Sequence, residues 1–125
     1  MVDIMKRKTR TITVNDKKYV WWYEIGDSIA VLFLSPKNDK TSTVKIIFKD
    51  SSCITENQFV LSVIIKKDNA EKCVTVVEPA MAGLVLPYLQ EQETFTPRKH
   101  IVIDGFELLE KMGYEVVGIK KCLYW

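Results

Sequence analysis

Alternation of apolar and polar residues dominates the first two thirds of the chain and is the pattern of half-buried strands. The stretch Thr41–Lys49 shows it most clearly, with Val44, Ile46 and Phe48 on one face and Lys45 on the other. Runs that alternate, or that are apolar on both faces as in Lys18–Glu24 and Ser28–Leu34, predict five more strands, the others being Thr9–Val14, Gln58–Lys66 and Lys72–Val77. Six strands joined by short links predict an antiparallel meander.

Two short links have the composition of specific hairpin turns. Asn15-Asp16 suits a two-residue type I′ turn, because both residue types tolerate positive φ. Gly26-Asp27 suits a type II′ turn, with glycine at the first central position.

The second predicted strand is the most distinctive stretch of the chain. Side chains alternate along a strand, so Tyr19, Trp21 and Tyr23 share one face while Val20 and Trp22 share the other. A strand that is apolar on both faces needs cover on both, which predicts a position in the middle of the sheet.

Two interpretations of this aromatic strand stay open. Core and cross-strand packing is favoured over an exposed groove that binds a partner. If Val20 and Trp22 face the core together with Ile12 and Val14, Trp21 is the outer tryptophan and is partly exposed. Under the groove interpretation, the predicted interaction surface comprises Arg10, Lys17, Lys18, Tyr19, Trp21 and Tyr23.

The apolar period changes after residue 78. A helical stripe with spacings of three and four residues is formed by Met81, Leu84, Val85, Tyr88 and Leu89. It predicts a helix over Pro79–Gln90, which Pro87 should kink or split because proline lacks the backbone N–H.

Residues 97–112 have two interpretations. One long helix would contain the β-branched run at 101–103 and would place Gly105 in its interior. A short strand Lys99–Ile103 followed by a helix Gly105–Met112 avoids both costs and is favoured.

The helix Gly105–Met112 has suitable residues at both of its ends. Asp104 is the expected N-cap, with Glu107 at the third helical position as in a capping box. Gly113 suits the position just after the helix. A last strand then runs over Tyr114–Gly118, or further to Tyr124. The predicted fold class is therefore α+β: an antiparallel meander of about six strands, two C-terminal helices packed on one face and a possible final strand.

Composition predicts one domain over residues 9–125, since 125 residues with 47% apolar side chains suit a single core. Residues 1–8 are predicted to form a flexible basic arm. The net charge is only +2, yet residues 1–20 carry six basic side chains against two acidic ones. A solvated arm and hairpin is favoured over a patch for an anionic partner.

The chain offers few groups for catalysis or metal binding. Its single histidine, His100, excludes a site with two histidines, and the three cysteines lack C-x-x-C spacing. Cys73 or Cys122 with His100 as base is the one candidate nucleophile pair, and only folding can bring them together. We expect no cofactor and no metal, and a non-enzymatic role is favoured.

Localisation follows from the same features. Cys53, Cys73 and Cys122 are widely spaced and odd in number, which indicates free thiols in a reducing cytoplasm. The N-terminus has no apolar signal-peptide region, and no apolar stretch is long enough to span a bilayer. The predicted location is cytoplasmic, with no membrane contact.

Three short segments resemble a group of small uncharacterised bacterial proteins. Residues 11–22, TITVNDKKYVWW, are similar to the opening ITV-N-G-K-x-Y-x-W-W of that group, with Asp16 in place of glycine. Val76-Val77-Glu78-Pro79 is similar to its V-x-P helix start, and residues 104–109 to its D-G-x-x-L-L segment. The resemblance implies an α+β fold with a meander sheet and transfers no activity and no site residues.

Three hypotheses for function follow. The first is a non-enzymatic interaction or accessory protein, including the type that neutralises a toxin, whose partner is another protein or a second copy. The second is a nucleic-acid-binding module that uses the basic N-terminal hairpin and the aromatic strand. The third is a small-molecule pocket or enzyme site between the sheet and the helix Pro79–Gln90.

Overall fold

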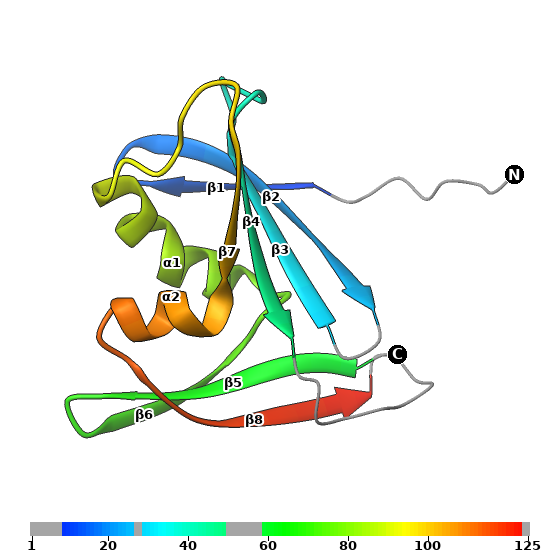
Figure 1. Cartoon of the computed structure of the whole chain (residues 1–125), viewed down its shortest axis with the longest axis vertical. Helices are drawn as coiled ribbons and strands as arrows, with labels where there is room; N and C mark the ends of the chain where they lie inside the picture. The colour runs from blue at the N-terminus through cyan, green and yellow to red at the C-terminus, as the bar shows by residue number, and fades with distance from the viewer. Residues whose placement is uncertain (1–8, 27–28, 50–58, 124–125) are drawn as a thin grey trace, which may run out of the picture.

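The computed structural model describes residues 9–26, 29–49 and 59–123 and shows an α+β fold with two sheets and two helices (Figure 1). The predicted fold class is confirmed. The basic arm 1–8, the Gly26-Asp27 turn and Cys53 lie wholly or partly outside the described residues, as does the side chain of Cys122.

The larger sheet has five strands in the order β1-β2-β3-β4-β7. Four of them form the predicted meander: β1 (Arg10–Val14), β2 (Lys17–Gly26), β3 (Ile29–Pro36) and β4 (Thr43–Lys49), each antiparallel to the next. Asn15 and Asp16 have φ of 49° and 66°, which agrees with the predicted type I′ turn. The fifth strand, β7 (His100–Asp104), lies parallel to β4 at the edge.

The smaller sheet has three strands in the order β6-β5-β8. They are β5 (Phe59–Lys67), β6 (Ala70–Thr75) and β8 (Glu115–Leu123), all antiparallel. The prediction of one meander of about six strands is therefore wrong after β4. Alternation identifies a strand but not its neighbour: β7 occupies the edge of β4, while β5 pairs with β6 and β8 instead.

Helix α1 (Pro79–Glu91) begins with its proline in the first turn, as expected. Pro87 does not split it, since the helix runs on to Glu91 with Pro87 exposed. None of the described helices is long and apolar enough to cross a lipid bilayer.

Helix α2 (Gly105–Lys111) follows β7 directly, which confirms the strand-then-helix interpretation. The Asp104 carboxylate accepts hydrogen bonds from the backbone N–H groups of Phe106, at 2.9 Å, and Glu107, at 3.2 Å. Gly113 has φ of +95°, the conformation that favours glycine just after a helix.

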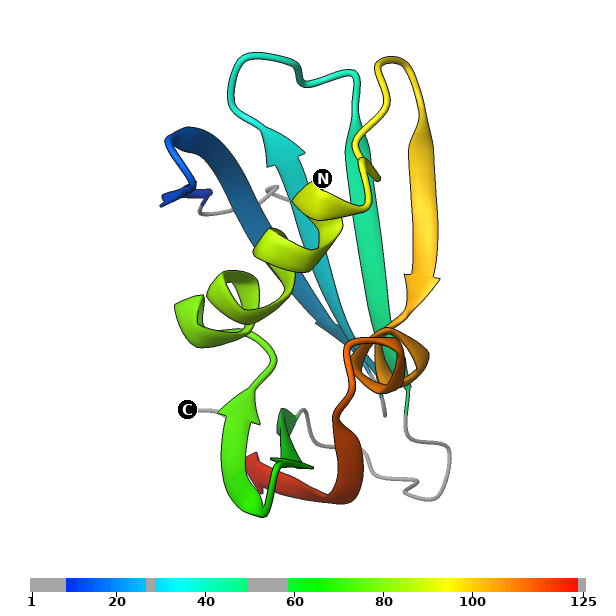
Figure 2. The same ribbon diagram turned by 90° about the vertical axis from the view of Figure 1, so that its left-hand side faces the viewer.

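The core lies on one side of the five-stranded sheet. Both helices and the three-stranded sheet are on that side (Figures 1 and 2). The largest fully buried side chains come from both sheets and both helices, and they include Trp21, Leu32, Phe48, Ile65, Leu86 and Leu109. At Gly105, the first residue of α2, the helix backbone lies directly against the Phe48 ring of β4.

Trp21 belongs to this core, with only 1% of its surface exposed. The expectation that Trp21 is the outer tryptophan is therefore wrong. The register places Trp21 opposite Leu34 on the helix-covered face, whereas Trp22 lies opposite Phe33 on the other face. Ile12 and Val14 share the face of Trp21, because β1 pairs Ile12 with Tyr19.

Candidate functional site

The outer face of the five-stranded sheet carries apolar side chains, yet no described helix or strand lies over it (Figure 1). We call it the outer face. The strand registers place on it Val20 and Trp22 of β2, Ile29, Val31 and Phe33 of β3, Ile47 of β4 and Val102 of β7. Val102 is 63% exposed, the largest fraction among the large hydrophobic side chains that the structure describes. Val31 is buried, while the other five residues of this set are partly exposed, and a partly exposed apolar surface of this kind is typical of an interaction site.

A stacked aromatic pair lies at the centre of the outer face. The rings of Trp22 and Phe33 are parallel within 3°, with centroids 5.3 Å apart. Both are partly exposed, so each offers apolar surface. The Lys45 ammonium lies 5.7 Å from the Phe33 ring centroid and adds a positive charge to the aromatic surface.

The indole of Trp22 has an unused hydrogen-bond donor. Its Nε1 lies below the surface with no acceptor among the described residues. A cavity of about 220 Å³ adjoins this indole and is lined also by Thr9, Ser35 and Lys40. An unpaired buried donor is costly, so a partner atom that accepts from it gains affinity.

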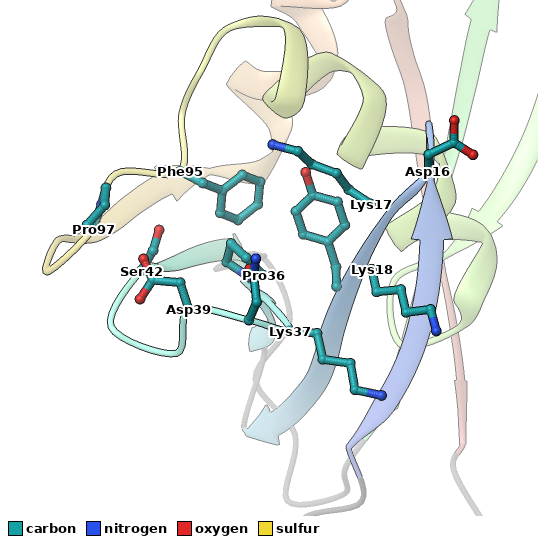
Figure 3. A pocket seen from close by; sticks show the side chains of 11 residues that line it. Asp16, Lys17, Lys18, Pro36, Lys37, Asp39, Ser42, Phe95 and Pro97 are labelled. Carbon is teal, nitrogen blue, oxygen red and sulfur yellow. The ribbon is translucent and has the colours of Figure 1, made fainter.

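A second feature is a cleft of about 620 Å³ at the end of the five-stranded sheet, which we call the end cleft (Figure 3). Three connections form it: the β1–β2 turn, the β3–β4 loop over residues 37–42, and the segment 92–99 between α1 and β7. Its walls combine the aromatic rings of Tyr19 and Phe95 with lysines of β2 and of the loop.

Hydrogen bonds fix the β3–β4 loop that forms the floor of the end cleft. The buried Ser35 hydroxyl donates to the carbonyl of Ser42 at 2.6 Å. The Asp39 carboxylate accepts from the backbone N–H of Thr41 at 3.0 Å and from its hydroxyl. Thr41 Oγ1 in turn accepts from the backbone N–H of Arg98 at 2.9 Å, which ties the loop to the segment before β7.

The opposite wall is fixed through one glutamine of α1. Gln90 Nε2 donates to the Tyr19 hydroxyl at 3.0 Å and to the carbonyl of Val14 at 3.3 Å. Its Oε1 accepts from the Asn15 side-chain amide at 2.8 Å. The Tyr19 ring then lies against Phe95, with centroids 5.1 Å apart.

The register places five of the six residues of the predicted interaction surface, all except Lys18, on the helix-covered face of the sheet. Tyr19 and Trp21 are only 2% and 1% exposed, and Tyr23 packs partly buried against the core. Arg10 lies 5.5 Å over the Trp21 ring centroid and covers its edge. Lys17 and Lys18 are exposed and line the end cleft together with Tyr19.

The predicted nucleophile pair is not supported by the residues that the structure describes. Cys73 is an exposed free thiol on β6, while His100 is exposed at the start of β7, and no described hydrogen bond joins them. The two strands belong to different sheets. Within the described part of the chain, no group of three or more histidine, cysteine or carboxylate side chains lies close enough to hold a metal ion.

A cavity between helix and sheet was also predicted, and one of about 430 Å³ lies there. It is lined by the last turn of α1, by β7 and by α2, with Tyr88, Ile103 and Lys111 among its residues. No described cysteine or histidine is part of its lining.

Sequence reasoning missed Phe33, Phe95 and Ser42. Phe33 could have been found, since an aromatic residue in an apolar strand must face one side of the sheet. Phe95 and Ser42 give no signal, because loops 50 residues apart in sequence form the cleft only after folding.

Comparison of this chain with protein-family models, with curated proteins and with solved structures found no match.

Proposed function

We propose that this chain is a non-enzymatic interaction protein of the bacterial cytoplasm, and that it binds a protein partner through the outer face. The observation that carries the proposal is the partly exposed Trp22–Phe33 stack on a sheet face that no other described element covers. Tryptophan is among the residues that most often dominate binding energy at protein interfaces.

The charges on the outer face indicate the chemistry of the partner. Lys18, Lys45 and Lys49 point to this face, against the carboxylates of Glu24 and Asp104. Lys45 lies beside the aromatic pair, and Asp104 lies at the edge strand, where its carboxylate caps α2. An apolar protein surface with acidic side chains opposite Lys45 complements this arrangement.

The nucleic-acid hypothesis required the face of Tyr19, Trp21 and Tyr23 as a stacking surface. Base stacking needs an accessible ring, and Tyr19 and Trp21 are buried beneath α1. The protein partner is therefore the function that the outer face supports best.

Site-specific crosslinking in the native host tests the proposal. A photoreactive benzoylphenylalanine replaces Val20 or Val102, both on the outer face, or Lys111 on α2 as the control. We expect one protein to be captured from both outer positions and not from Lys111. Purified wild-type chain added in excess should compete for it.

The captured partner then allows a quantitative test with purified proteins. Trp22→Ala should weaken binding by tenfold or more, as for a central interface tryptophan. Lys45→Gln should weaken it by roughly threefold, in a salt-dependent manner. Lys66→Gln, on the other sheet, is the matched control and should leave the affinity unchanged. Absence of crosslinks at both outer positions, or crosslinks only between copies of this chain, contradicts a foreign protein partner.

A further inference from the structure

We infer that the end cleft is a second, separate binding site, and that it takes a small organic anion with a flat ring system and a hydroxyl group at the end opposite the anionic group. The inference is independent of the proposed partner surface. The end cleft lies at the end of the sheet, in three connections, and shares only Lys18 with the charged residues named on the outer face. Its volume of about 620 Å³ falls within the range of small-molecule sites.

The apolar wall of the end cleft selects a flat ring. Tyr19 and Phe95 lie with their centroids 5.1 Å apart and their planes tilted by 41°. Pro36 and Pro97 lie near Phe95 and extend the apolar lining (Figure 3). Phe95 is partly exposed and supplies the ring surface, while the buried Tyr19 supports it from behind, so an aromatic ligand packs against Phe95 in a position that is already fixed.

The mouth of the end cleft selects a negative charge. Lys17, Lys18 and Lys37 line it together with Asp16, and all four are exposed, so the lysines outnumber the carboxylate there. In Figure 3 the Lys17 side chain extends towards Phe95, whereas Lys18 and Lys37 extend away from it. Lys17 is therefore the residue placed to contact an anionic group on a ring that lies against Phe95, and the other two contribute longer-range attraction.

The floor of the end cleft selects a hydroxyl group. The Ser42 side chain is 2% exposed, and its Oγ has no hydrogen-bond partner among the described residues. Buried hydroxyls are normally paired, so this one marks a place for a ligand atom. The adjacent Asp39 carboxylate accepts from Thr41 and lines the same floor.

These groups also orient the ligand. The negative charge of Asp39 disfavours an anion at the floor, while the lysines favour it at the mouth. A neutral hydroxyl can accept from Ser42 Oγ or donate to Asp39. Since hydrogen bonds within the loop hold Ser35, Asp39 and Thr41, binding needs little reorganisation of the floor.

Three related probes separate the contributions of the two ends. The compound 6-hydroxy-2-naphthoate has both the anion and the hydroxyl, 2-naphthoate lacks the hydroxyl, and 2-naphthol lacks the anion. Titration of the full chain by two-dimensional amide NMR measures each affinity. We expect the complete probe to bind about tenfold more tightly than either partial probe and to shift the amides of residues 37–42 and Phe95.

Substitutions then assign the groups. Ser42→Ala should remove most of the advantage of 6-hydroxy-2-naphthoate over 2-naphthoate and leave 2-naphthoate binding unchanged. Lys17→Gln should weaken both naphthoates by roughly three- to tenfold and leave 2-naphthol unchanged. Lys66→Gln, on the second sheet, is the control for net charge and should change nothing. Phe95→Leu tests the ring contact separately and should weaken all three probes.

Equal affinities for the three probes would overturn the inference, as would amide shifts confined to residues outside the end cleft. A Ser42→Ala variant that lowers all three affinities equally would also overturn the role of the hydroxyl. Thermal melts of each variant exclude loss of fold as the cause, because Ser42 Oγ makes no described hydrogen bond that its removal would break.

Discussion

The two faces of the five-stranded sheet are built by the same strands, and both carry large apolar side chains, yet they differ in what covers them. Trp21 and Trp22 are neighbours in sequence and lie on opposite faces. Trp21 is 1% exposed beneath the helices, whereas Trp22 is partly exposed and stacks on Phe33. Apolar character alone therefore does not identify the core of this protein.

The elements that cover one of the two faces follow β4 in the sequence. Both helices and the second sheet pack against the face of Trp21, because their own apolar side chains, such as Met81 and Leu109, need the same cover. The outer face receives no such element from the described residues. Apolar side chains on a face that no described element covers are the pattern expected if a partner protein binds there, as proposed above.

The largest expected effect separates the two tryptophans. Trp21→Ala should lower the free energy of unfolding by roughly 3–5 kcal/mol, because it leaves a large cavity among Leu34, Tyr23 and the helices. Trp22→Ala should cost less than half as much, since its ring is partly exposed. Urea denaturation of both variants measures the difference, and equal losses would mean that both faces are core.

The second largest change in the free energy of unfolding is expected from overpacking the helix-covered face of the five-stranded sheet. In Gly105→Ala the added Cβ would lie 2.6 Å from Cδ1 of Phe48 and closer still to Cε1 and Cζ. The ring is fully buried and cannot move freely, so we expect a loss of roughly 1–3 kcal/mol.

Gly83→Ala is the matched control for this substitution. Gly83 is exposed in α1, and its Cβ would make only an ordinary contact of 3.8 Å with Ile12. Alanine has the higher helix propensity, so this variant should gain about 0.5–1 kcal/mol. Thermal melts that show the same sign for both glycines would contradict the tight packing of α2 against β4.

The third effect comes from the N-cap of α2, at the junction between β7 and the helix. Asp104→Ala should lose about 1 kcal/mol, because the carboxylate accepts the N–H groups of both Phe106 and Glu107. Asp104→Asn keeps an acceptor and should retain most of that free energy. Chemical denaturation of the two variants side by side measures the cap, and an Asn variant as unstable as the Ala variant would show that the acceptor is not what matters.

The parts of the fold that are determined locally were predictable. Alternation, or a run of apolar or β-branched residues, located the strands in the described regions, and the Asp104 cap with Gly113 located α2, because these features depend on residues close in sequence. The strand pairing after β4 was not predictable. The parallel β4–β7 pair joins residues more than 50 positions apart, and an apolar strand such as β5 is compatible with either sheet.

The candidate sites were predictable only in part. The sequence identified the aromatic strand and lysines 17 and 18, and these do line the end cleft or the outer face. It placed Trp21 on the wrong face. Both faces of β2 are apolar, and alternation shows which residues share a face but not which face the helices cover. It gave no indication of Ser42, whose unpaired hydroxyl is a property of the folded loop alone.

The smallest effect tests the outer face at its edge strand, where Val102 and Ile103 are neighbours on opposite faces. Replacing each by Thr keeps the β-branched shape, so strand propensity changes little and the surroundings determine the result. Ile103→Thr should cost roughly 1–2 kcal/mol, because Ile103 packs against the core and the hydroxyl loses water there. Val102→Thr should change the free energy of unfolding by no more than about 0.5 kcal/mol, because Val102 is 63% exposed. The same Val102→Thr variant should bind the captured partner more weakly if the interface reaches β7. A Val102→Thr variant as destabilised as Ile103→Thr would show that the outer face is covered from within the chain, and the comparison between the two faces would then fail.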